Sequence, residues 1–111
     1  MANETSQAAT FLKNRDSWIR EVVGDTALCH PTVRVGVHLA MRMNGARQSG
    51  AWPKMATIAK QTGVSVRGVI NALADLEGFD RKTKEWTGRR YITADRKRNV
   101  GNRYWLNFWW E

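Results

Sequence analysis

The sequence has few of the features that mark secreted, cross-linked or membrane proteins. Cys29 is the only cysteine among 111 residues, so an intramolecular disulfide is excluded and a reducing compartment is favoured. The N-terminal segment lacks the basic stretch followed by an apolar run that a secretory signal requires. The longest apolar runs are far too short to cross a bilayer. We therefore expect a soluble cytoplasmic protein with no membrane partner.

The signatures of catalysis and of metal binding are also missing. Cys29, His30 and His38 have spacings that match no familiar metal site, and we expect structural roles for both histidines. There is no evident Ser/His/Asp or Cys/His set and no glycine loop that would hold a phosphate, and the carboxylates are scattered along the chain. We therefore expect no enzymatic activity, no cofactor, no metal and no small-molecule ligand.

Aromatic residues, by contrast, are abundant for a chain of one-domain length. Hydrophobic residues make up 42% of the sequence, which is a globular composition, and the six tryptophans concentrate burial capacity. We expect Trp18, Trp52, Trp86 and Trp105 in the core or at its rim. Trp109 and Trp110 have two alternatives: they close the core, or they form an apolar patch that pairs with a second subunit.

Positive charge is concentrated in the second half of the chain. The net charge is +8, and residues 54–111 contain twelve Lys/Arg against six Asp/Glu. Residues 89–103 alone contain six basic residues and one acid, Asp95. Such a local field favours a polyanion, of which nucleic acid is the commonest, and a solubilising solvated face is the alternative.

The periodicity of apolar residues predicts a mainly helical α+β fold. Residues 1–7 are polar and are predicted to be a flexible N-terminus. The predicted helices are a first one from about residue 8 to Gly24 with Thr5 or Ser6 as its cap, a second from Pro31 to residue 43, and two more at 55–62 and 65–77. A short extended piece is expected at 51–53 and a hairpin of strands at 90–93 and 103–109, while 79–88 stay unassigned.

The stretch ATIAKQTGVSVRGVINAL has the pattern of two helices crossing at a sharp turn. Gly63 supplies the turn, small Ala59 lies where the helices cross, and Val64 fills the turn. Ser65 is placed to cap the second helix, although Thr62 occupies a position that is more usually aliphatic. The apolar positions that would seat the two helices are Ile58, Val69, Ala72, Leu73 and Leu76.

The run WPKMATIAKQTGVSVRGVINALADLE, followed by a basic hairpin, resembles the winged helix-turn-helix DNA-binding proteins. It is most similar to bacterial, phage and plasmid regulators and replication-protein N-terminal domains, and residues 31–43 are similar to the helix that precedes the motif in that family. The resemblance implies one winged helix-turn-helix domain over 8–111, with the helix-turn-helix at 55–77 and the wing at 89–109. It also implies three to four helices, one small antiparallel β-hairpin, and a place on the nucleoid in bacterial cytoplasm. The long passage at 79–88 departs from the family pattern.

Double-stranded DNA is the partner that this fold implies, with helix 65–77 in the major groove and the wing on phosphates. Gly68 would allow the helix to approach the DNA backbone closely. The residues expected to contact bases are Ser65, Val66, Arg67 and Asn71. The residues expected to contact phosphates are Lys54, Lys60, Arg89, Arg96, Lys97, Arg98 and Arg103.

Three functions are compatible with the sequence. The first is a sequence-specific transcriptional regulator. The second is an origin-binding domain of a plasmid or phage replication protein, or a recombination accessory factor, with the chain cut from a longer protein. The third is a winged helix that binds protein, with Trp109 and Trp110 as anchors. A homodimer formed through the N-terminal helix or through Trp109 and Trp110 is compatible with all three.

Overall fold

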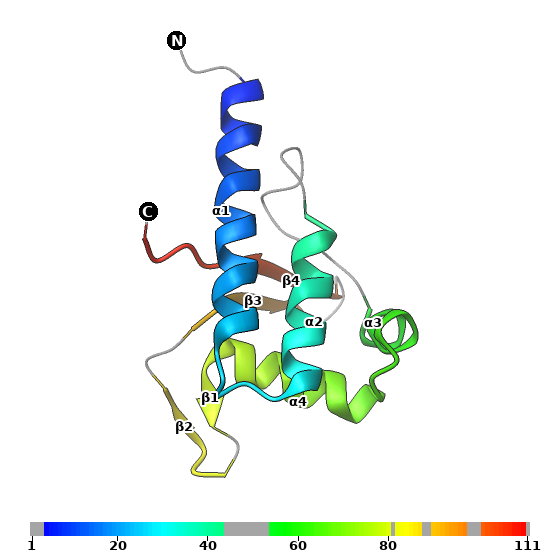
Figure 1. The fold of residues 1–111 in the computed structure, drawn as a ribbon. Helices are drawn as coiled ribbons and strands as arrows, with labels where there is room; N and C mark the ends of the chain where they lie inside the picture. Colours follow the sequence, from blue (N-terminus) through cyan, green and yellow to red (C-terminus); the bar gives the residue numbers. More distant parts are fainter. Residues whose placement is uncertain (1–3, 44–53, 81, 88–89, 98–100, 111) are drawn as a thin grey trace.

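The computed structural model describes residues 4–43, 54–80, 82–87, 90–97 and 101–110. Within these residues the fold is mainly helical α+β, as predicted, with four helices and two antiparallel strand pairs (Figure 1). The elements in chain order are α1 Glu4–Gly24, α2 His30–Met41, α3 Met55–Thr62, α4 Val66–Glu77, β1 Phe79–Asp80, β2 Glu85–Trp86, β3 Ile92–Lys97 and β4 Gly101–Leu106. The extended piece predicted at 51–53 lies outside the described residues.

Helix α1 begins earlier than the sequence pattern predicts. It starts at Glu4 rather than near residue 8, so the predicted caps Thr5 and Ser6 lie inside the helix, and residues 4–7 are helical. Two features favour this early start. An acidic residue in the first turn complements the helix dipole, and the two alanines at 8 and 9 are strong helix formers. The helix ends at Gly24, as predicted.

Helix α2 is the central element and lies beside α1 and across α4 (Figure 1). It begins at His30, with Pro31 in the first turn, where the missing proline N–H has no intrahelical partner. Its buried face includes Val35, Leu39 and Ala40. The helices α1, α3 and α4 all pack against α2. The buried side chains of α2 therefore join the other three helices in one core.

The hairpin of β3 and β4 forms the sheet layer behind α1 and α2 (Figure 1). Its register runs from Ile92 opposite Leu106 to Lys97 opposite Gly101. Both strands are displaced relative to the prediction, because β3 starts at 92 rather than 90 and β4 spans 101–106 rather than 103–109. Ile92 and Tyr104 are fully buried, which fixes the hairpin against the helices.

The segment that sequence patterning left unassigned forms a second, smaller hairpin. In it, Phe79 pairs with Trp86 and Asp80 with Glu85. Lys84 adopts a left-handed conformation with φ of 60°, and its N–H donates to the Asp80 carbonyl at 2.7 Å. Periodicity could not find strands of two residues each, since alternation needs a longer run.

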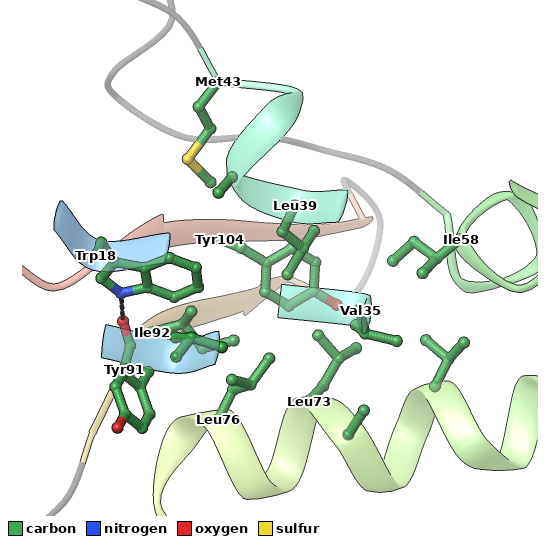
Figure 2. Close-up of a cluster of buried hydrophobic side chains, with 14 of the residues drawn as sticks. Trp18, Val35, Leu39, Met43, Ile58, Leu73, Leu76, Tyr91, Ile92 and Tyr104 are labelled. Carbon is green, nitrogen blue, oxygen red and sulfur yellow. Dashed lines mark hydrogen bonds between the residues drawn. The ribbon is translucent and has the colours of Figure 1, made fainter. Parts of the chain in front are cut away.

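The core is a single cluster to which every helix and the β3–β4 hairpin contribute (Figure 2). Figure 2 shows Leu73 and Leu76 on α4 directed toward Val35 and Ile92. The Trp18 indole N–H donates to the Tyr91 carbonyl at 2.9 Å inside this cluster. The fully buried large side chains include Trp18, Val22, Val35, Leu39, Met43, Ile58, Val69, Leu73, Leu76, Ile92 and Tyr104.

The tryptophans divide between core and surface. Trp18 lies in the core, as predicted, and Trp105 is partly buried. The prediction for Trp86 is wrong, because this side chain is 61% exposed on the β1–β2 hairpin. A two-residue strand at the edge of the fold cannot cover so large a ring. Trp52 lies outside the described residues.

None of the helices in the described part of the chain combines the length and the apolar character that spanning a bilayer requires.

Replacing Trp18 with phenylalanine tests whether α1 is locked to the sheet layer through the indole. We expect the free energy of unfolding to fall by about 2 kcal/mol, because Trp18→Phe leaves a cavity and removes the indole hydrogen bond to the Tyr91 carbonyl. Urea unfolding should show a lower midpoint with an unchanged m-value. Val23→Ala on the same helix is the control, since Val23 is 60% exposed, and it should change stability by less than about 0.5 kcal/mol.

Candidate nucleic-acid interface

The turn between α3 and α4 is closed by backbone geometry that glycine favours. Gly63 ends α3 with φ of 76°, and its N–H donates to the Ala59 carbonyl at 2.9 Å. Thr62, the departure from the usual pattern, has a specific role in this turn. Its hydroxyl donates to the Ile58 carbonyl at 2.7 Å and accepts from the Val64 N–H at 3.2 Å. A buried threonine therefore satisfies a turn donor that an aliphatic residue would leave unpaired.

Helix α4 begins with a side-chain cap, as predicted. The Ser65 hydroxyl accepts from the Gly68 N–H at 3.0 Å. Gly68 also has a packing role that sequence reasoning missed. A Cβ added there would lie 2.6 Å from Val64 Cγ1, so glycine leaves room for the residue that fills the turn. Internal packing alone therefore accounts for this glycine.

The two faces of α4 differ sharply. Val69, Ala72, Leu73 and Leu76 are buried, as the helix-turn-helix pattern predicts, and this apolar stripe packs against α2 and α3. On α3, Ile58 is buried and Ala59 is partly buried at the crossing. The inward face thus fixes the rotation of α4 about its own axis. That rotation determines which side chains α4 presents to solvent.

The outward face of α4 presents the residues predicted to read bases. Ser65, Val66 and Arg67 are exposed at the N-terminal end, and Asn71 is half-buried one turn after Arg67. Ile70 is 42% exposed between them and lies on the same face. The structure therefore brings the predicted base-contacting residues together at one end of one helix. Whether they contact DNA stays a prediction.

Up to the last turn of α4, the helix-turn-helix lies in a part of the chain without acidic residues. Residues 26–74 contain six basic residues and no Asp or Glu. This signal is visible in the sequence, but a count of charge over each half of the chain does not reveal it. The first acids after this span are engaged by the fold. Asp75 accepts from the Thr32 hydroxyl at 2.9 Å, and Glu77 is 8% exposed. The solvent face of α4 therefore carries one cation, Arg67, and no free carboxylate.

The predicted phosphate contacts are only partly described. Lys54 and Lys60 are exposed, just before α3 and in its last turn. Arg103 is half-buried on β4, opposite Asp95, and its guanidinium lies 5.1 Å from the Trp105 ring centre. Arg89 and Arg98 lie outside the described residues, as do the side chains of Arg96 and Lys97 on β3.

Cys29, His30 and His38 are not brought together as metal ligands. In the part of the chain that the structure describes, no group of three or more His, Cys, Asp or Glu side chains could hold a metal. His30 is the first residue of α2, and the Cys29 thiol lies 3.1 Å from the Thr32 hydroxyl. Burial, and then the nearby charge of Arg42, lowers the pKa of His38 below its usual value.

The C-terminal aromatic residues lie against α1 and against Tyr91, which precedes β3. The Trp110 indole N–H donates to the Asn14 side-chain oxygen at 2.9 Å, and the Phe108 ring packs at a tilt against Phe11 with ring centres 5.7 Å apart. Trp109 makes an edge contact with Tyr91 at 5.6 Å. Both tryptophans nevertheless stay exposed, by 54% for Trp109 and 39% for Trp110. They extend the core at its rim without being enclosed by it.

Comparison with known proteins agrees with this geometry. Residues 37–80 match a family model described as a helix-turn-helix domain. The match covers the C-terminal part of α2, both helices of the turn and β1. The helix-turn-helix predicted from the sequence is therefore confirmed, and this domain indicates DNA binding. No curated protein and no solved structure matches the chain.

Substituting Gly63 isolates the conformational cost of the turn. A Cβ at this position meets no atom within 4 Å, so strain at φ of 76° is the only penalty. We expect Gly63→Ala to lower the free energy of unfolding by about 1 kcal/mol, and Gly63→Asn to lower it less, because asparagine tolerates the left-handed region. Gly24→Ala is the matched control, since its Cβ also meets nothing. Equal destabilisation by the two alanine substitutions in urea unfolding would contradict this account.

Proposed function

We propose that this protein is a sequence-specific double-stranded DNA-binding protein that acts as a transcriptional regulator. The observation that carries the proposal is the outward face of α4, which is held by a buried apolar stripe and carries a cation and short polar and apolar side chains. A major groove is wide enough for one α-helix, and HTH recognition helices contact base edges with residues near their N-terminus.

Each side chain at that end of α4 has a chemical counterpart on a base pair. The Arg67 guanidinium matches the two acceptors of guanine, and the Asn71 amide matches the acceptor and donor of adenine. Val66, which is 47% exposed, is an apolar partner for a thymine methyl group, and Ile70 extends this apolar contact. Three kinds of contact on one helix face support recognition of a defined sequence of bases.

Phosphate contacts would come from the residues around the turn and from the β3–β4 hairpin. Lys54 immediately precedes α3 and Lys60 lies in its last turn, and neither α3 nor α4 has an acidic residue in its first turn. The positive ends of both helix dipoles are therefore not offset by a local carboxylate. Arg89, Arg96, Lys97, Arg98 and Arg103 supply the predicted charge of the wing.

A protein that binds one duplex site regulates by occupying it. Where the site overlaps a promoter, occupancy excludes or recruits the transcription machinery, and no chemical step is required of the bound protein. Regulation of this kind requires site selectivity, which a selection from random duplexes measures directly. Recovery of one defined motif is the expected outcome.

Salt dependence tests whether the interaction is electrostatic. If about six phosphates are neutralised, the logarithm of the association constant should fall against the logarithm of salt concentration with a slope near −5. The measurement is a fluorescence anisotropy titration of the selected duplex at several salt concentrations. Affinity that stays constant across salt would contradict the proposal.

Substitution of Arg67 separates base reading from phosphate contact. We expect Arg67→Ala to weaken binding to the selected site by about 1–3 kcal/mol and to relax the preference at one base position. Lys60→Ala is the matched control, since Lys60 is also an exposed cation of the helix-turn-helix. It should weaken all duplexes alike and reduce the salt slope by about 1. Loss of equal size on selected and scrambled duplexes with Arg67→Ala would contradict a base-reading role.

A further inference from the structure

The β1–β2 hairpin is attached directly to the last turn of α4. Gly78 ends α4 in a left-handed conformation with φ of 86°, and the Thr87 N–H donates back to the Gly78 carbonyl at 2.6 Å. The Tyr91 N–H donates to the Leu76 carbonyl at 2.8 Å. Hydrogen bonds therefore connect both ends of the segment between α4 and β3 to α4, the helix that we propose reads DNA. Movement of α4 moves the hairpin with it.

The described surface of this hairpin is basic and carries an exposed aromatic ring. Lys82 and Lys84 in the hairpin loop and Arg90, which follows the hairpin, are exposed, against one exposed acid, Glu85. The Arg90 guanidinium lies 5.3 Å from the centre of the Trp86 ring, a cation–π arrangement that holds the guanidinium at the surface.

The other acid of the hairpin, Asp80, accepts hydrogen bonds within the hairpin loop. The Asp80 carboxylate accepts from the N–H groups of Lys82 at 2.9 Å and Thr83 at 3.4 Å. These hydrogen bonds keep the pKa of Asp80 below its usual value. Asp80 thus fixes the loop that presents Lys82 and Lys84.

The hairpin projects beyond the body of the molecule at the C-terminal end of α4 (Figure 1). The core, α1 and α2 lie on the other side of α4, so the hairpin and the solvent face of α4 are on the same side of the molecule (Figure 1). Helix α4 has twelve residues and is about 18 Å long. A helix of that length with its N-terminal end among the bases has its C-terminal end near the phosphates that border the groove.

We infer that the β1–β2 hairpin is a second DNA-contacting element, which binds the phosphate backbone next to the bases read by α4. Lys82, Lys84 and Arg90 contact the phosphates, and Trp86 positions Arg90 without reading sequence. This inference rests on the proposed function. It assigns a role to a segment that departs from the family pattern and that nothing in the helix-turn-helix itself requires.

Tethered cleavage of DNA locates the hairpin in the complex. In a Cys29→Ser background, which retains a hydroxyl near Thr32, Thr83→Cys carries an iron chelate that generates hydroxyl radicals. We expect cuts confined to one flank of the selected site, outside the bases whose preference depends on Arg67. Thr10→Cys is the control, since this residue is exposed and belongs to the N-terminal half of α1, which extends away from α4 (Figure 1). Cleavage from Thr83→Cys no stronger than from Thr10→Cys would overturn the inference.

A pair of charge substitutions measures the contact. Lys82→Ala with Lys84→Asn removes both lysines, and asparagine suits the left-handed conformation at 84. On a duplex with long flanks the salt slope should decrease in magnitude by about 2, whereas on a duplex trimmed to the α4 site it should not change. Lys13→Ala with Arg20→Ala on α1 makes the same change in net charge and should leave both slopes unaltered.

The outcomes separate the two proposals. If Arg67→Ala weakens binding but the hairpin pair alters neither slope, the hairpin inference is wrong and the proposed function stands. If the hairpin pair and the α1 pair reduce the magnitude of the salt slopes equally, the change in net charge explains the effect, and the hairpin inference is also wrong. If the unaltered protein binds no duplex, both proposals fail.

Discussion

Burial of one apolar stripe on α4 is the constraint on which the rest of the structure depends. Val69, Leu73 and Leu76 are withdrawn from water against α2, and burial of each such side chain contributes about 1.5–3 kcal/mol before the entropy of ordering is subtracted. The stripe fixes the rotation of α4 as well as its position. The exposure of Arg67 is therefore a consequence of packing on the opposite face.

The remaining elements hold this arrangement from two sides. On one side, the Thr62 hydroxyl and the left-handed Gly63 close the turn, in which the Gly63 and Val64 N–H groups both have acceptors. On the other side, Trp18 joins α1 to the start of the sheet layer through the Tyr91 carbonyl. The Tyr91 hydroxyl in turn donates to Asp25 between α1 and α2. Segments that are distant in sequence therefore pack together around α4, the helix that carries the proposed site.

The positions of the acidic and basic residues are compatible with both the fold and the proposed DNA binding. Over residues 26–74 there is no Asp or Glu, and beyond this span Asp75 is engaged within the fold and Asp80 within the β1–β2 loop. Positive charge on a projecting hairpin contributes little to folding, because like charges repel. Contact with a polyanion accounts for the exposed lysines and arginine on that hairpin better than packing does.

The sequence by itself determined the helices on either side of Gly63, their buried stripe and the Ser65 cap, because these follow from local spacing and from backbone preferences. Its charge distribution was compatible with a polyanion as partner and also with a solvated surface. Only the tertiary structure decided the β1–β2 hairpin and the exposure of Trp86, since strands of two residues leave no periodic signal. The packing role of Gly68 and the early start of α1 were likewise decided by contacts and context beyond the local pattern. Spacing specifies which face of a helix is apolar, whereas the neighbours that cover the face, and the segments left projecting from it, depend on how distant parts of the chain meet.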